Sequence, residues 1–93
     1  MPAVKEQKDW DVRQAAGAAG RYFQALYPNV NSYSLEEVEL SEDEKYWIIT
    51  LSFDWGSKTS VLGAIQPPKT KYKLFKVDVK TGKVVSMKIR NLE

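Results

Sequence analysis

The sequence contains neither cysteine nor histidine. Without thiols it can form neither a disulfide nor a thiolate nucleophile. Without imidazole as well, the usual protein ligand sets for zinc and the commonest general base at neutral pH are missing. No serine, lysine or carboxylate stands beside an identifiable base that would activate a nucleophile. We therefore expect a protein that is not an enzyme and that uses no metal ion or other cofactor.

Long hydrophobic runs are also missing. No stretch approaches the ~20 consecutive apolar residues that a membrane span needs. Residues 1–8 lack the apolar centre of a signal peptide and have the composition of a flexible tail. These features predict a cytoplasmic protein without a membrane partner, and removal of a leader from the chain is the alternative.

The chain does contain enough apolar material for one core. Of its 93 residues, 43% are hydrophobic and 12% aromatic, which excludes a disordered chain on composition. A chain of this length accommodates one domain, which we place at residues 9–93.

Residues 9–27 have the periodicity of an amphipathic helix, which Asp9 or Asp11 would cap. The interior Gly17 and Gly20 each cost about 1 kcal/mol relative to alanine. Close approach of the helix to a sheet would explain them, and a hinge is the alternative. The positions expected on the buried helix face are Val12, Ala15, Ala16, Ala19, Tyr22, Phe23 and Leu26.

Four segments have the alternation of strands. Residues 35–40 alternate acidic and apolar side chains, and residues 46–53 carry bulky residues on both faces, as a central strand does. Residues 71–79 and 84–90 flank a turn containing Gly82 and predict a hairpin. The hairpin residues expected to face the core are Phe75, Val77, Val79, Val85, Met87 and Ile89.

Residues 54–70 break this regularity with two glycines and two prolines, and we expect a long loop there. Because the segment also contains apolar residues, a short strand within it, or partial packing on the core, is the alternative. The order of elements predicts an α+β fold. One N-terminal helix would pack on a curved antiparallel sheet of about three to four strands.

Three segments resemble the PepSY-like domains: Val38–Leu40, Tyr46–Leu51 and the Val-Asp-x-x-Thr-Gly-x-Val hairpin within residues 76–85. The resemblance covers roughly residues 10–90. It implies a cystatin-like helix on a curved sheet and a non-enzymatic role, often the inhibition or escort of a peptidase. The chain departs from the family in lacking an export signal and in its long 54–70 segment.

Charge is unevenly distributed along the chain. Residues 1–33, 34–68 and 69–93 carry net charges of +1, −5 and +6, which give the total of +2. Complementary charges on neighbouring strands would account for this pattern. A basic patch for an acidic partner is the second interpretation.

Two short motifs carry little chemistry. Gly56-Ser57-Lys58-Thr59 lacks the upstream glycine of a phosphate-binding loop and is interpreted as a polar loop. Glu42-Asp43-Glu44 lacks the spacing of a calcium loop and is interpreted as a solvated turn.

The outward face of the sheet is the candidate binding surface, with an aromatic and aliphatic centre inside a charged rim. We expect an inhibitor or accessory protein that binds another protein, or a second copy of itself, through this face. Isolated apolar residues on a small domain, or cover by residues 54–70, are the alternatives. The candidate residues are Tyr46, Ile48, Thr50, Tyr72, Leu74, Lys76 and Lys88.

Nucleic-acid binding by the C-terminal hairpin is the alternative function. Its basic residues interleave with Tyr72 and Phe75, which suits phosphate contacts and base stacking. A small ligand between helix and sheet is a third hypothesis. The basic residues concerned are Lys69, Lys71, Lys73, Lys76, Lys88 and Arg90.

Overall fold

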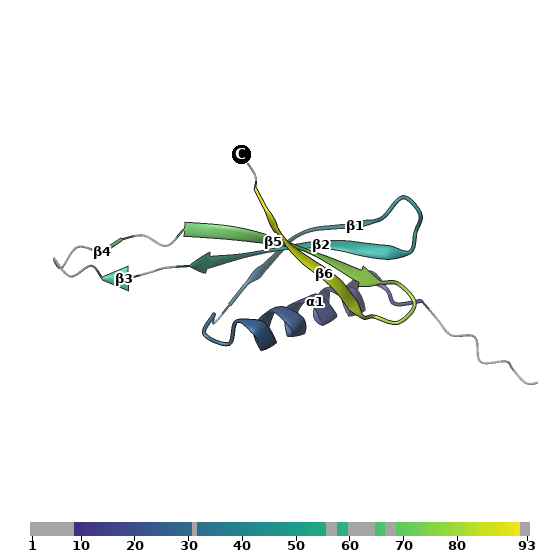
Figure 1. Cartoon of the computed structure of the whole chain (residues 1–93), viewed down its shortest axis with the longest axis horizontal. Helices are drawn as coiled ribbons and strands as arrows, with labels where there is room; N and C mark the ends of the chain where they lie inside the picture. Colours follow the sequence, from purple (N-terminus) through teal and green to yellow (C-terminus); the bar gives the residue numbers. More distant parts are fainter. Residues whose placement is uncertain (1–8, 31, 56–57, 60–64, 67–68, 92–93) are drawn as a thin grey trace, which may run out of the picture.

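A computed structural model describes residues 9–30, 32–55, 58–59, 65–66 and 69–91. One helix packs on one face of a four-stranded antiparallel sheet with strand order β1-β2-β5-β6 (Figure 1). The predicted α+β class is confirmed, and the sheet is open. The tail predicted at residues 1–8 lies outside the described residues. The elements are α1 (Val12–Leu26), β1 (Ser34–Leu40), β2 (Tyr46–Trp55), β3 (Lys58–Thr59), β4 (Ile65–Gln66), β5 (Lys69–Asp78) and β6 (Val84–Arg90).

A capping box starts α1. The backbone N–H of Gln14 donates to Asp11 Oδ1 at 2.8 Å, and the N–H of Asp11 donates to Gln14 Oε1 at 2.9 Å. These bonds satisfy two donors that a helix start leaves without partners. The helix begins at Val12 and not at Asp9, because Asp11 is the cap and the backbone of Trp10, before it, bonds to Val79 and Trp47 instead.

Trp10 ties the segment before α1 to the sheet. Its N–H donates to the carbonyl of Val79 at 2.7 Å, and its own carbonyl accepts from Trp47 Nε1 at 2.8 Å. Its indole lies against Gly82, where an added Cβ would overlap the ring, and where φ is +74°. Glycine is therefore required at this position both by the turn and by Trp10.

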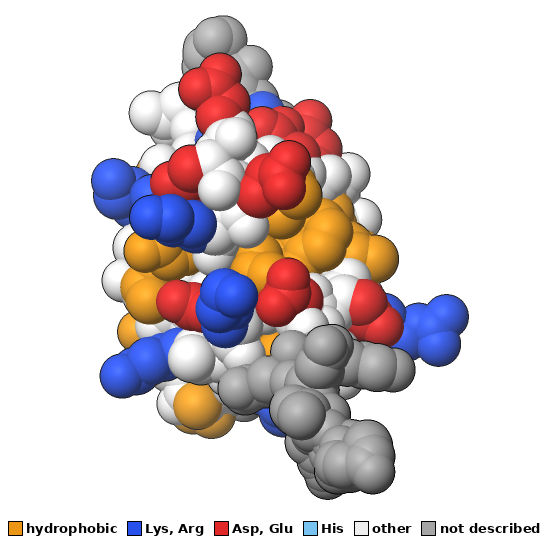
Figure 2. All heavy atoms as spheres, turned by 90° about the vertical axis from the view of Figure 1, so that its right-hand side faces the viewer, with side chains coloured by type: hydrophobic (Ala, Val, Ile, Leu, Met, Phe, Trp, Pro, Cys, Tyr) orange, Lys and Arg blue, Asp and Glu red, His pale blue; other side chains and the backbone are white. Residues whose placement is uncertain are grey.

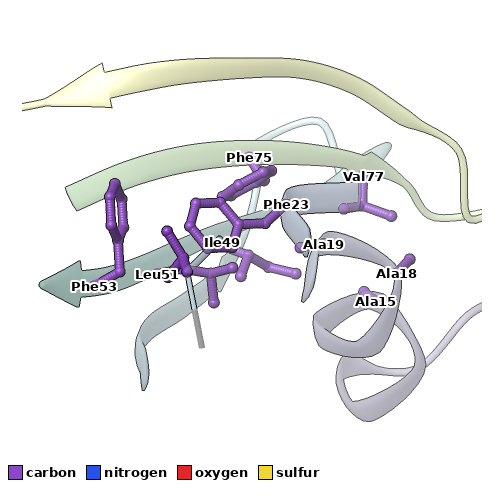
Figure 3. Packing of buried hydrophobic residues seen from close by; sticks show 10 residues of the cluster. Ala15, Ala18, Ala19, Phe23, Ile49, Leu51, Phe53, Phe75 and Val77 are labelled. Atoms are coloured by element: carbon purple, nitrogen blue, oxygen red, sulfur yellow. The ribbon is translucent and has the colours of Figure 1, made fainter. Parts of the chain in front are cut away.

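The core lies between α1 and the sheet (Figure 3). Ala15, Ala19 and Phe23 form the buried stripe of the helix. Phe23 packs against Phe53 and Phe75, with ring centroids at 4.8 and 6.4 Å. The predicted helix face was too wide, because Val12, Tyr22 and Leu26 are 42%, 39% and 50% exposed. The remaining buried apolar side chains are Ala18, Val30, Ile49, Leu51, Val77 and Val79.

The two helix glycines differ. A Cβ at Gly20 would overlap the phenol of Tyr33, just before β1, whereas a Cβ at Gly17 would meet only the tip of Arg21 at 3.3 Å. Close approach therefore explains Gly20, although the neighbour is Tyr33 and not the sheet. It does not explain Gly17.

The β5–β6 hairpin is present, with a correction to its inward residues. The register shifts between Lys76 and Val77, so Val84 pairs with Val77 and Met87 with Phe75. Val84 therefore packs against the core in place of Val85, which is 47% exposed. Ile89 was also predicted to face the core but is 73% exposed.

The described part of segment 54–70 contains strands, which was the alternative to a long loop. β2 and β5 stay paired out to Trp55 and Lys69, and β3 and β4 pair beyond them. Figure 1 shows β3 and β4 past the end of the four-stranded sheet, not above it. The described part of this segment therefore leaves the face opposite α1 uncovered.

Candidate functional site

The outer face, the face of the four-stranded sheet opposite α1, carries the candidate site. Strand pairing arranges its side chains in rows that cross the sheet from β1 to β6. One row is Glu39, Ile48, Lys76 and Ser86, and the next is Glu37, Thr50, Leu74 and Lys88. A third is Ser52, Tyr72 and Arg90. Alternation along each strand places these residues on one face because the residues between them point to the helix.

The centre of the outer face is apolar and hollowed. Ile48 and Leu74 are half-buried on the two central strands, and the hydroxyl-bearing Thr50 between them is 2% exposed. A shallow groove of about 450 Å³ runs over them, open to solvent. Its lining residues are Glu37, Glu39, Ile48, Thr50, Leu74, Lys88, Ile89, Arg90 and Asn91.

Arg90 crosses this groove. Its Nη1 donates to Thr50 Oγ1 at 2.8 Å and to Glu37 Oε1 at 2.5 Å, so a side chain on one edge strand reaches the other edge. This is the one ion pair within the described residues. Through this bond the buried hydroxyl oxygen of Thr50 accepts a hydrogen bond from Arg90, so this oxygen has a partner within the protein.

Two further contacts order the rim. Lys76 Nζ lies over the Tyr46 ring, 5.0 Å from its centroid, and Ser52 Oγ donates to Glu36 Oε2 at 2.6 Å. Basic groups thus belong to β5 and β6, and acidic groups to β1. The charge asymmetry of the sequence becomes a division across one face.

All seven residues of the predicted protein-binding set lie on the outer face or its edge. The register brings Ile48, Thr50, Leu74 and Lys88 into the groove and places Lys76 beside it. Sequence reasoning left out Glu37 and Glu39 as groove residues. Alternation with the inward-facing Val38 already predicts that both point outward, but the pairing of β1 with β2 is needed to show that they line the groove.

The basic residues predicted for nucleic-acid binding do not form one patch. Lys76, Lys88 and Arg90 belong to the outer face, whereas Lys69, Lys71 and Lys73 pair with Trp55, Phe53 and Leu51 on the helix-side face. The predicted set is therefore divided between opposite faces of the sheet. Successive side chains of a strand point to opposite faces, so the odd-numbered lysines of β5 lie on the helix side and the even-numbered Lys76 lies on the outer face.

The helix-side lysines have aromatic neighbours past the end of α1. Lys73 Nζ lies 5.5 Å from the centroid of the Tyr27 ring, and Tyr27 contacts Trp55 edge-on at 6.2 Å. Trp55 is 46% exposed. We call Tyr27, Trp55, Lys69, Lys71 and Lys73 the basic strip.

The acidic turn between β1 and β2 is organised by its own hydrogen bonds. Asp43 accepts from the Ser41 hydroxyl at 2.6 Å and the Lys45 N–H at 3.0 Å, and these bonds lower its pKa. No cluster of three or more potential metal-ligating side chains occurs within the described residues. Figure 2 views this end of the molecule, where acidic and basic side chains surround hydrophobic surface.

No family model, curated protein or solved structure matches the chain. The resemblance to PepSY-like domains therefore stays a prediction. In the part of the chain that the structure covers, no helix has the length and apolar character needed to cross a membrane.

Proposed function

We propose that the chain is a non-catalytic protein-binding module, an inhibitor or accessory protein, that acts through the outer face. One observation carries the proposal. Half-buried Ile48 and Leu74 lie in an open groove whose rim holds charges of both signs. Protein interfaces have this organisation, with a desolvated apolar centre and a polar rim that orients the partner.

The architecture supports the proposal in a second way. α1 covers only one face of the sheet, and the described residues of segment 54–70 extend the hairpin past the end of the sheet. The outer face is thus formed by four strands without a covering layer in the described residues. A partner that supplied this layer would bury Ile48 and Leu74.

Affinity capture with matched variants tests the proposal. Ile48→Lys/Leu74→Lys introduces two ammonium groups into the groove and should abolish capture of the partner from a host extract. The control is Val12→Lys/Leu26→Lys, which makes the same chemical change at helix residues that are 42% and 50% exposed. Circular dichroism and thermal unfolding should show that both variants fold. Equal capture by the two variants would contradict the proposal.

The basic strip supports a second candidate function, binding of single-stranded nucleic acid. Lys69, Lys71 and Lys73 occupy alternate positions of β5 and so lie in a row on one face of the sheet. Exposed Trp55, beside them, offers a ring on which a base could stack. Replacing Lys69, Lys71 and Lys73 with glutamine should remove salt-sensitive retention on an oligonucleotide column. Glutamine at Lys76 and Lys88, on the outer face, should change retention less. No retention of the unmodified chain at low salt would eliminate this candidate.

A further inference from the structure

We propose that the outer face takes a second copy of this chain, related by a two-fold axis parallel to the strands. The inference rests on the proposed function and names the partner for the same surface. It follows from the way in which charge is distributed over the face.

Acidic and basic groups occupy opposite sides of the outer face. Glu36, Glu37 and Glu39 belong to β1, at one edge, where the guanidinium of Arg90 compensates one of the three charges. Lys88 belongs to β6, at the other edge, and Lys76 to the neighbouring β5. Ile48 and Leu74 lie on β2 and β5 between them. From one edge to the other, the face is therefore acidic, apolar and basic.

A two-fold axis parallel to the strands exchanges the two edges. It places β1 of each copy over β6 of the other and keeps each row at its own height along the strands. Glu37 then faces Lys88 of the second copy, and Glu39 faces Ser86 with Lys76 beside it. Both edges of the interface gain pairs of opposite charge, as isologous contact requires.

The alternative two-fold axis, in the plane of the face and perpendicular to the strands, places β1 over β1 and β6 over β6. Carboxylates would then face carboxylates, and lysines would face lysines. Like charges brought together in this way cost free energy. The charge pattern thus selects one of the two symmetric arrangements.

The apolar centre fits the same arrangement. The axis runs between β2 and β5, so Leu74 of one copy lies over the position of Thr50 of the other, where the Arg90 side chain bonds the buried hydroxyl. Ile48 meets the methylene chain of Lys76. A lysine can cover an apolar neighbour with its methylenes while its ammonium stays at the rim. Two twisted sheets stacked in this way pack aligned, as in a sandwich.

The size of the face sets the expected strength. Edge strands of seven residues and a width of four strands give a surface of about 23 by 19 Å. The area of this surface is about half of the roughly 800 Å² per partner that stable complexes bury. We therefore expect a dimer that dissociates on dilution.

Cysteine cross-linking tests both the partner and the axis, because the chain has no cysteine of its own. A mixture of Glu39→Cys and Ser86→Cys chains should form a mixed disulfide dimer several-fold faster than either variant alone. The control mixture pairs Glu39→Cys with Lys80→Cys, at the exposed β5–β6 turn. Sedimentation of the unmodified chain should show a monomer–dimer equilibrium.

Three results would overturn the inference. They are a monomer at every concentration up to about 1 mM, a test mixture that cross-links no faster than the control mixture, and preferential cross-linking of Glu39→Cys to itself. If the chain is monomeric but captures another protein in an Ile48- and Leu74-dependent way, the second copy is rejected and the proposed function stands. A dimer that persists in Ile48→Lys/Leu74→Lys would place the contact between the copies elsewhere and reject the inference, whereas the capture experiment decides the proposed function.

Discussion

Arg90 on β6 and Glu37 on β1 form an ion pair across the whole width of the outer face, 53 positions apart in the chain. The guanidinium reaches β1 over the central strands and bonds the hydroxyl of Thr50 on its way. This contact links the two edge strands and fixes one wall of the groove. The candidate binding surface is therefore ordered by the fold before any partner arrives.

Removing either end of this contact should have unequal effects. Glu37→Gln should cost less than about 1 kcal/mol of unfolding free energy, because Glu37 is 58% exposed and exposed ion pairs contribute little. Arg90→Ala should cost more, about 1–2 kcal/mol, since it also removes the bond to a hydroxyl of a residue that is 2% exposed. Urea unfolding of the two variants measures the difference. Equal losses would show that the bond to Thr50 contributes nothing.

The two helix glycines should respond in opposite directions to the same substitution. Gly20→Ala should destabilise the protein by about 1–3 kcal/mol, because the methyl group would overlap Tyr33. Gly17→Ala should stabilise it by up to about 1 kcal/mol, because alanine is the better helix former and only a flexible arginine tip is near. Thermal unfolding of both variants is the measurement. Stabilisation by Gly20→Ala would contradict the described packing of Tyr33.

The bond between Trp47 and the carbonyl of Trp10 should hold the segment before α1. Trp47→Phe removes the indole N–H and should cost about 1–2 kcal/mol. Amide exchange at Trp10 should also become faster, since its N–H bond to Val79 depends on the same placement. Trp55→Phe is the control because Trp55 is 46% exposed. Unchanged exchange at Trp10 in Trp47→Phe would exclude this role.

Stability should fall in acid partly through Asp78. The backbone N–H groups of Thr81 and Lys80 donate to its carboxylate and lower its pKa below the usual 3.8. A lowered folded-state pKa gives stability that is present above the unfolded value and is lost as the pH falls through the folded value. The loss therefore occurs below about pH 4. Asp78→Asn should flatten this part of the pH–stability curve, and an unchanged curve would reject the assignment.

The alternation of side chains along the strands predicted most of the candidate site. It placed Ile48 and Thr50 on the face opposite Ile49, because a central strand can be divided into faces without knowing its neighbours. The same rule would have separated Lys73 from Lys76, since their positions differ by an odd number. The prediction of one basic patch did not apply this rule to the C-terminal lysines.

Other features were beyond local patterns. The exposure of Val85 follows from a register shift that depends on pairing with β5, and a bulge has no sequence pattern strong enough to predict it here. The path of Arg90 to Glu37 depends on the strand order, which places β6 and β1 at opposite edges of one sheet, so that the arginine side chain crosses the central strands to reach Glu37. The glycine, proline and polar residues of segment 54–70 favoured a loop, whereas its described residues continue the hairpin.

Methyl NMR tests the central claim, that the outer face is the binding surface, most directly. Spectra of a chain labelled at isoleucine, leucine and valine methyl groups would be recorded with increasing amounts of the captured partner. If no partner protein has been captured, the spectra would be recorded while the concentration of the chain is raised from about 10 μM to about 1 mM. The methyl signals of Ile48 and Leu74 should shift or broaden while those of Val12 and Leu26 stay in place. Changes at Val12 and Leu26 with Ile48 and Leu74 unaffected would contradict the claim.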